Sequence, residues 1–551
     1  MSRNASIGSK AIRAAGWTAL LLGLGLVALP QLLYPLGFDQ AVYAACGDAI
    51  RRGGVPIKDC FETKQMGVMV MYSIAQRLSL APPAIHALTL VWTAATSVVI
   101  AWLTGRLFAP AVTGLGPRLQ AGAWAGMFYW LMYAGINYWS MGQAETFSNL
   151  FLALAWAGIA LAPARDRPGA ALLIGAGAAI GAAIWFKYVF ALAGVGLGIV
   201  LLIRVWMASP GAPQARFLAA ARSGALFASG ALAVSAGVAG YYALVGGFAA
   251  LGDQFQMLRD IFPLAPPRPF PEVVAMMLRF FDNGADLTGR FKATLPVREY
   301  IVLGGGFPIV IGLAAAGAIA RARGSAFGVG AGFALFAAAT ALVIWQGNYI
   351  QYHYTLLMLP LAVLAGAAAD RVSDSPSQFG RLARLTARGL AIGAVMLLVW
   401  RMWPVMTDAW VNTVIERKSL RQMYLESYQA PHIPVAEQIA AATQPTDSIA
   451  IIGDAPWVYT LAGRANATRF AFVNQWLKRA GTVSHATFVG QYYSDLARNR
   501  PAYVILVKAG FPWEGVDYLP DYKAATPIYE YVEANYQYEG ENGPFLLFRR
   551  K

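Results

Sequence analysis

The chain has 551 residues, of which 58% are hydrophobic and only 13% are charged, and its mean hydropathy is +0.49. A soluble protein carries about 25% charged residues, so this composition excludes a fully soluble globular protein and predicts one that is largely embedded in a lipid bilayer. The net charge of +15 would suggest nucleic acid in a soluble protein. Here the basic residues lie in short connections between apolar runs, where they set membrane topology instead, so no nucleic-acid partner is expected.

Apolar runs of spanning length recur along the chain. Because a spanning helix needs roughly 20 apolar residues, we place about eleven spans, at 16–36, 86–105, 119–136, 145–162, 169–186, 188–206, 223–245, 300–320, 326–345, 355–370 and 389–406. The first run follows Arg3, Lys10 and Arg13 and lacks a small-residue cleavage site, which favours a retained span over a signal peptide. With a cytoplasmic N-terminus, every short inside connection is basic, as the positive-inside rule requires.

Three regions then fall on the outer side of the membrane. The sequence predicts a transmembrane core, 1–406, with outer loops at 37–85 and 246–299, followed by an outer domain at 407–551. Within that domain, helical patterns at 435–443 and 485–499 alternate with short strand patterns at 448–453, 502–507 and 545–549. Such alternation is typical of a small α/β domain. The predicted fold class is therefore an α-helical polytopic membrane protein with a small C-terminal α/β domain.

The stretch from 37 to 67, called the opening loop below, is unusually rich in ionisable side chains for so apolar a chain. Asp39 begins a helical pattern that Gly53 and Gly54 should end, so it stands where an N-cap residue belongs. A carboxylate held at the rim of a cavity can also act as a general base toward an alcohol. Asp48, on the same helix, is expected to be solvated.

A second group of charges, Asp59, Glu62 and Lys64, directly precedes an apolar segment at 66–80. The simplest interpretation is a hydrated surface. If the side chains instead lie near lipid head groups, Lys64 can meet an anionic phosphate, whereas Asp59 or Glu62 can bind a polar substrate group or a divalent cation. The sequence leaves the metal open.

The chain has two cysteines, Cys46 and Cys60, and both lie in the opening loop. On the oxidising side of a bacterial inner membrane they are candidates for a disulfide. Such a bond would join the Asp39 helix to the segment that carries Lys64. The alternative is two small buried side chains.

Three further ionisable residues stand at the outer ends of predicted spans. These are Glu145, Lys187 and His353. A charge at a span end is often a helix cap or a snorkelling lysine, but charges this close to a membrane are also functional candidates. They gather at one membrane face, whereas a transport path through the bilayer would place charges at mid-depth.

In layout and in a few residues, the sequence resembles the GT-C glycosyltransferases that use polyprenyl-phosphate sugars. The likeness is to the branch of the protein mannosyltransferases and the lipid A aminoarabinose transferase. It rests on Asp39 and Tyr43 in the first outer loop, Lys64 before an apolar segment, and His353 with Tyr354 at a late span. The family's second acidic residue is Gln40 here, and its Lys-Pro-Pro-Leu is Lys-Gln-Met-Gly at 64–67.

The resemblance implies an inverting transfer of one hexosyl or pentosyl unit from a polyprenyl-phosphate donor to an envelope glycan, lipid or protein. Asp39 would be the general base, and the phosphate would be held by Lys64, Lys187 and His353. The substrate would be contacted by Tyr43, Asp59, Glu62, Glu145 and Tyr354. The expected location is a bacterial inner membrane, with a cytoplasmic N-terminus and a periplasmic C-terminal domain.

Alternative functions are a lipid-linked-sugar flippase, an oligosaccharide transferase and a non-catalytic membrane scaffold. A flippase would be expected to show charges at mid-bilayer and internal repeats. A scaffold leaves the charge of the opening loop unexplained.

Overall fold

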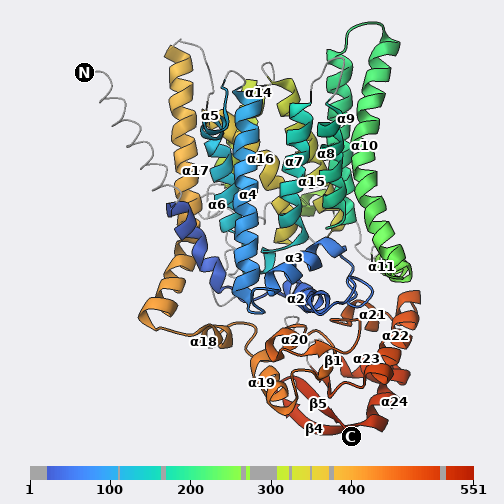
Figure 1. Cartoon of the computed structure of the whole chain (residues 1–551). Coiled ribbons are helices and arrows are strands. Elements are labelled where there is room, and N and C mark those ends of the chain that lie inside the picture. Colours follow the sequence, from blue (N-terminus) through green and yellow to red (C-terminus); the bar gives the residue numbers. More distant parts are fainter. Residues whose placement is uncertain are drawn as a thin grey trace.

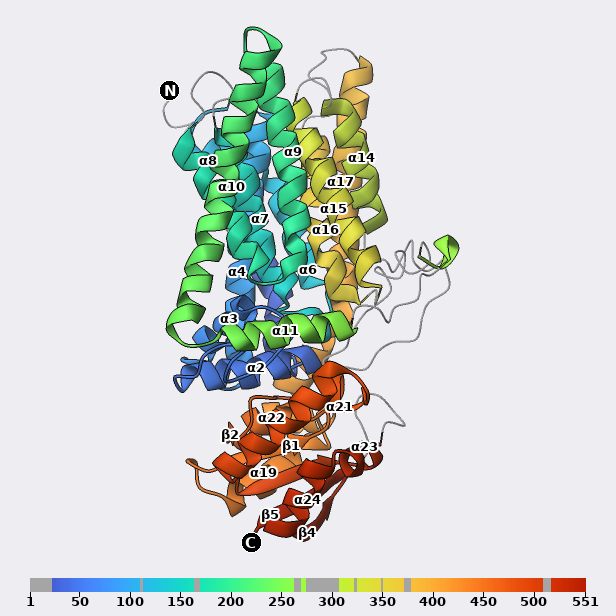
Figure 2. The same ribbon diagram turned by 90° about the vertical axis from the view of Figure 1, so that its right-hand side faces the viewer.

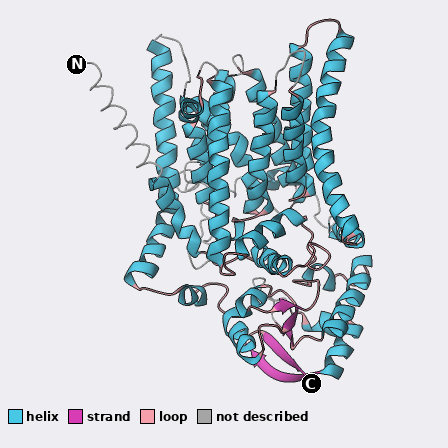
Figure 3. Ribbon diagram, in the orientation of Figure 1, coloured by secondary structure: helices cyan, strands magenta, loops and turns pink. Residues whose placement is uncertain are grey.

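The computed structural model describes residues 22–109, 112–162, 169–261, 269–273, 307–321, 325–347, 350–370, 378–508 and 517–551. These residues form a bundle of long helices and, at one end of it, a smaller domain that contains all five strands (Figures 1 and 3). The first residues of the first predicted span, 16–21, and most of the predicted loop 246–299 lie outside the described residues.

The bundle consists of apolar helices that run roughly parallel to one another (Figures 1 and 2). Among the described residues, seven helices are long and apolar enough to cross a membrane, or eight if a bent pair counts as one. Counting shorter helices as well, the described part of the bundle contains α4 (Pro82–Phe108), α5 (Leu115–Ala121), α6 (Ala123–Ala134), α7 (Ala144–Leu161), α8 (Ala170–Ile184), α9 (Ala191–Ala208), α10 (Pro213–Leu244), α14 (Phe307–Arg321), α15 (Ala326–Gln346), α16 (Thr355–Asp370) and α17 (Gln378–Trp410).

The predicted fold class is confirmed, and two predicted spans differ in detail. The span at 119–136 is divided at Gly122 into α5 and α6. A Cβ at Gly122 would lie 1.9 Å from the carbonyl oxygen of Ala101, so the bare glycine lets this segment approach α4. The first span is described from Leu22 to Leu33 and then bends by 80° into α2 (Phe38–Arg51).

Helix α16 occupies the centre of the bundle. Its apolar stretch is fully buried, and the helix packs against α4, α6, α7, α14, α15 and α17. Small residues allow this packing, because a Cβ at Gly366 would lie 2.7 Å from the backbone nitrogen of Ala125. Within a bilayer the hydrophobic effect does not drive helices together, and close packing at small residues stabilises helix pairs instead.

Three shorter helices cover the end of the bundle that carries the C-terminal domain: α2, α3 (Met66–Gln76) and α11 (Phe248–Ile261). They lie across this end rather than along the bundle (Figure 2). Helix α2 ends where the sequence predicts, since Arg51 is its last residue and Gly53 has φ +99°. The opening loop is thereby placed between the bundle and the C-terminal domain.

The C-terminal domain is built on a mixed sheet of order β2-β1-β3-β5-β4. The first three strands are parallel, and β5 pairs antiparallel with β3 and β4. Strand β3 is buried along its whole length, which suits its continuous apolar sequence. The strands are β1 (Ser448–Ile452), β2 (Ala465–Asn466), β3 (Tyr503–Val507), β4 (Tyr536–Asn542) and β5 (Phe545–Arg550).

Helices surround this sheet, so the predicted α/β organisation is confirmed. The two predicted helices correspond to α19 (His432–Ala442) and α22 (Val483–Asn499). The remaining helices are α18 (Leu420–Leu425), α20 (Trp457–Ala462), α21 (Asn474–Leu477), α23 (Leu519–Ala524) and α24 (Thr526–Asn535).

A buried carboxyl group stands just beyond β1. Asp454 is fully buried and accepts hydrogen bonds from the Asn474 amide and the Tyr518 hydroxyl. Burial raises the pKa of Asp454 from its ordinary value of 3.8 to about 7. The folded domain therefore prefers the neutral acid, whereas the unfolded chain ionises near pH 4.

We expect the domain to lose stability as the pH rises through this window. Below pH 4 the Asp454 carboxyl group is protonated in both the folded and the unfolded state. Between pH 4 and 7 only the unfolded chain loses this proton, so the free energy of unfolding falls by about 4 kcal/mol across this range. Asp454→Asn should remove most of this dependence, while Glu530→Gln at an exposed position should keep it. Thermal unfolding of the full chain from pH 4 to 8 measures this, and an unchanged slope in Asp454→Asn would contradict it.

Candidate active site

Asp39 lies in the first turn of α2, at the end of the bundle that meets the C-terminal domain. The prediction that Asp39 caps this helix is wrong. The N-cap is Gly37, whose N–H donates to Oε1 of Gln40 at 2.7 Å. Because Gln40 satisfies the helix end, the Asp39 carboxylate is available for another contact, and its Oδ2 lies 3.2 Å from Nζ of Lys64.

Gln40 also fixes the position of α2. Its side-chain amide donates to the carbonyl oxygen of Met141 at 2.6 Å. The same amide also donates to the carbonyl oxygen of Tyr138. Gln40 is fully buried, and its oxygen and both of its N–H groups are bonded within the protein rather than to water. The residue at the position of the family's second acid therefore orients the helix that presents Asp39.

Lys64 is surrounded by negative charge and an aromatic ring. Its side chain is 14% exposed, and Nζ lies 5.1 Å from the centre of the Tyr43 ring. Burial by itself lowers the pKa of Lys64, but the carboxylates of Asp39, Glu62 and Glu145 outweigh it, so the pKa is raised. Lys64 is thus a stably charged cation in a partly dehydrated site.

A second lysine and carboxylate lie beside the first pair. Nζ of Lys187, in the break between α8 and η3 (Tyr188–Phe190), is 2.7 Å from Oε1 of Glu145 and also donates to the Gln346 side chain. Glu145 stands in the first turn of α7 and is fully buried. Burial lowers the pKa of Lys187, and the positive charge of Lys64 lowers it further, while Glu145 opposes both.

Tyr352 lies beside the second ion pair. Its ring centre lies 5.8 Å from Nζ of Lys187. Its neighbour His353 is buried with its ring centre 4.5 Å from that of Tyr352. The structure thereby brings together side chains from α2, the opening loop, α7, the α8–η3 break and η6 (Gln351–Tyr354).

Four further residues were predicted to contact the substrate: Tyr43, Glu62, Tyr354 and Asp59. Tyr43 is buried and donates to Oε1 of Gln143 at 3.1 Å. Glu62 is buried, and burial raises the pKa of its carboxyl group, an effect that Lys64 opposes. Tyr354 is buried in η6. Asp59 accepts a hydrogen bond from the Val55 N–H at 2.7 Å and lines a separate groove beside the C-terminal domain.

A disulfide joins Cys46 of α2 to Cys60 of the opening loop, with a Cα–Cα distance of 5.1 Å. It closes the loop at a point four residues before Lys64. The helix that carries Asp39 and the segment that carries Lys64 are therefore covalently held together.

The acidic side chains of this site do not suit a divalent cation. Oxygen ligands for such an ion must converge from several residues. Asp39 and Glu145 instead each face a lysine, and no group of three or more His, Cys, Asp or Glu side chains arranged for a metal occurs in the described ranges. Positive charge is supplied here by Lys64 and Lys187.

Sequence reasoning missed two side chains that complete the site, Gln346 and Tyr352. Gln346 is the last residue of α15 and reaches Lys187 across the bundle. A signal for Tyr352 was present, because it directly precedes His353. Nothing in the sequence pattern pairs Gln346 with Lys187, which only helix packing brings together.

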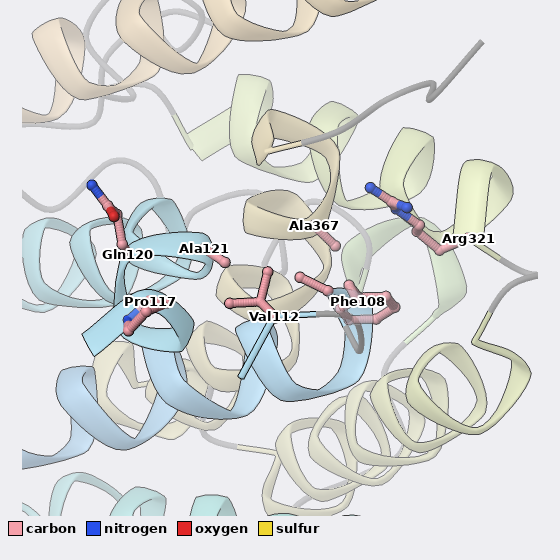
Figure 4. A pocket seen from close by; sticks show the side chains of 8 residues that line it. Phe108, Val112, Pro117, Gln120, Ala121, Arg321 and Ala367 are labelled. Carbon is pink, nitrogen blue, oxygen red and sulfur yellow. The ribbon is translucent and has the colours of Figure 1, made fainter. Parts of the chain in front are cut away.

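A cavity of about 310 Å³ lies at the opposite end of the bundle (Figure 4). Its only charged lining residue among the described residues is Arg321, and none of the predicted site residues lines it. The lining residues are Phe108, Ala109, Val112, Pro117, Gln120, Ala121, Arg321 and Ala367. The ionisable cluster and this cavity are thus separate features of the bundle.

The buried pair of Glu145 and Lys187 predicts a specific pattern of stability changes. Removing one partner leaves an uncompensated buried charge, which costs about 3–5 kcal/mol, whereas replacing both with neutral side chains of similar size costs much less. Glu145→Gln and Lys187→Met alone should therefore destabilise the chain more than the double variant does. Thermal unfolding of the three variants in detergent measures this, and additive losses would contradict it.

No protein-family model matches the chain, and no curated protein matches it significantly. Solved structures do resemble it. ArnT from Cupriavidus metallidurans in the apo state has a TM-score of 0.55 at 14% identity, covering 97% of this chain and 98% of that chain. The same protein bound to undecaprenyl phosphate has a TM-score of 0.50 at 13% identity, with the same coverage.

A weaker likeness is to the oligosaccharyltransferase AglB from Archaeoglobus fulgidus in complex with an inhibitory peptide and a dolichol-phosphate. Its TM-score is 0.44 at 12% identity, covering 96% of this chain and 74% of that chain. At such identities the likeness to ArnT concerns the fold alone. Over nearly its whole length, the chain therefore shares the overall fold of the ArnT structures.

Proposed function

We propose that the chain is an inverting membrane glycosyltransferase that moves one hexosyl or pentosyl unit from a polyprenyl-phosphate carrier to an acceptor. The observation that carries this proposal is the partly buried cluster that contains the Asp39–Lys64 ion pair and Lys187. A carboxylate next to two cations, at one end of a membrane bundle, offers a base for a hydroxyl group and a binding site for a lipid phosphate.

The donor is inferred from charge and fold together. A phosphate that becomes a leaving group gains negative charge, which preorganised cations in a dehydrated site stabilise strongly. Lys64 and Lys187 have side chains only 14% and 15% exposed. The ArnT structure of the same fold was determined with undecaprenyl phosphate bound, which supports a polyprenyl carrier for this chain.

In the proposed reaction, the acceptor oxygen attacks the anomeric carbon from the side opposite the phosphate. The bond between the anomeric carbon and the phosphate oxygen breaks, and the phosphate departs with the electron pair. Asp39 takes the proton of the acceptor hydroxyl. Lys64 and Lys187 hold the phosphate, with His353 beside them, and the in-line displacement inverts the anomeric centre.

Topology supports an outer location for this chemistry. The basic connections predicted inside the cell lie at the bundle end opposite the cluster, as the position of Arg106 in the last turn of α4 illustrates. The proposed site therefore faces the periplasm of a bacterial inner membrane. The acceptor would be an envelope glycan, lipid or protein.

Asp39→Asn tests the proposed base. We expect kcat for transfer from undecaprenyl-phosphate-linked sugars to fall by about 10²–10⁴, the usual contribution of a general base. Asp48→Asn is a control on the same helix. The expectation that Asp48 is solvated is wrong, because the side chain is buried and pairs with Arg51 and Arg52 rather than with the cluster. Release of undecaprenyl phosphate from a panel of such donors measures the rate, and full activity of Asp39→Asn would refute the role.

Lys64→Met tests the proposed phosphate contact. Removing one donor to a developing anion costs about 10²–10³ in kcat, and we expect a loss of this size together with weaker donor binding. Lys64→Arg keeps the charge and should recover part of the activity. Equal activities of the Met and Arg variants would show that the charge of Lys64 does not act on the donor.

A further inference from the structure

A polar groove of about 710 Å³ lies where α22 meets the opening loop. This volume is within the range of about 300–1,000 Å³ that is usual for ligand pockets. Side chains from the opening loop, the segment after β2 and α22 line the groove. These are Lys58, Asp59, Asn466, Ala467, Thr468, Arg469, Thr487, Gly490, Gln491, Ser494, Asp495, Arg498 and Asn499.

The charges in this groove are largely neutralised within the protein. Arg469 pairs with Asp253 at 3.1 Å, and Arg498 pairs with Asp495. What the groove offers a ligand is therefore a polar surface with little net charge. The exposed Thr487 hydroxyl can donate and accept hydrogen bonds, while the Gln491 and Asn499 amides already donate to Asp253 and to the Ala467 carbonyl. That combination matches a ligand rich in hydroxyl groups better than a polyanion.

Arg469 forms a fixed wall of the groove. Its guanidinium donates to Asp253 of α11 at 3.1 Å, to Gln491 of α22 at 3.0 Å and to the Ile57 carbonyl of the opening loop at 3.2 Å. The same group lies 5.4 Å from the centre of the Phe61 ring. Helices α11 and α22 are neighbours at this junction (Figure 2). The groove is thus held by side chains from three segments.

The opening loop connects the groove with the candidate active site. Asp59 lines the groove, and Lys64, five residues later, contacts Asp39. Five residues span at most about 18 Å. Between them, Cys60 is held by the disulfide and Phe61 pairs with Phe470 of the C-terminal domain in a β-bridge. The groove and the ionisable cluster therefore keep a fixed and short separation.

We propose that this groove binds the saccharide part of the acceptor, so that the C-terminal domain selects the molecule that receives the sugar. The acceptor role rests on the proposed transferase function. A polyprenyl donor enters from the bilayer, whereas the groove lies on the side of the C-terminal domain. A glycan chain attached either to a lipid or to a protein would present the same hydroxyl groups to α22.

Gly490→Trp is a direct test, because it fills the groove without disturbing the fold. A Cβ at Gly490 meets no atom within 4 Å, and replacing a glycine inside a helix favours that helix. Ala534→Trp, on the exposed face of α24 and outside the groove, adds comparable bulk. A second variant, Thr487→Ala with Ser494→Ala, removes two exposed hydroxyl groups from the groove.

Binding of the purified full chain to an array of neutral and acidic bacterial oligosaccharides is the first readout. We expect wild type and Ala534→Trp to bind neutral glycans equally, Gly490→Trp to bind at least tenfold more weakly, and the double variant to be weakened about tenfold through two lost hydrogen bonds. No binding by wild type, preference for acidic glycans alone, or equal binding by all variants would overturn the proposal.

Asp39→Asn separates this proposal from the transferase function. It should bind glycans like wild type, because Asp39 does not line the groove. In the transfer assay, Gly490→Trp should raise KM for a lipid-linked or a protein-linked glycan acceptor and leave cleavage of the donor by water unchanged. The acceptor that shows the change identifies the source of the glycan. Glycan binding without any transfer would refute the transferase and leave the groove as a saccharide site.

Discussion

The arrangement of this protein depends on two ion pairs, the partly exposed pair of Asp39 with Lys64 and the pair of Lys187 with the fully buried Glu145. Charges taken out of water are costly unless opposite charges and hydrogen bonds compensate them. The fold adds to this compensation at Lys187, which donates to Gln346 of α15 and lies 5.8 Å from the centre of the Tyr352 ring. In the proposed function these cations bind a lipid phosphate, and the neighbouring carboxylates raise the pKa of Lys64 and so keep it charged.

The bundle explains how such a site can be held rigid. Its central helix, α16, is buried on all sides and begins directly after η6, which contains Tyr352 and His353. Glu145 stands in the first turn of α7, and the break after α8 presents Lys187. Each side chain thus stands at the end of a packed helix, where backbone position is fixed by the core. Precise placement of reacting groups is worth several orders of magnitude in rate.

The opening loop and the C-terminal domain close the site from the other side. The disulfide between Cys46 and Cys60 holds the loop to α2, and Arg469 holds the loop to α11 and α22. A transferase has two substrates of different chemistry. In the proposed reaction, the bundle meets the lipid-linked donor and the polar groove meets the acceptor.

The class of the protein, the course of most spans and the strands of the C-terminal domain can be predicted from the sequence, because each depends on local apolar runs and their period. The sequence also singled out Asp39, Lys64, Glu145, Lys187 and His353, because charges are rare in so apolar a chain. Only the tertiary structure decided which charges meet. Gln40 rather than Asp39 accepts the hydrogen bond from the N-cap N–H of α2. Gln346 contacts Lys187, from which it is 159 positions away in the sequence. Such contacts follow from helix packing, which sequence periodicity does not encode.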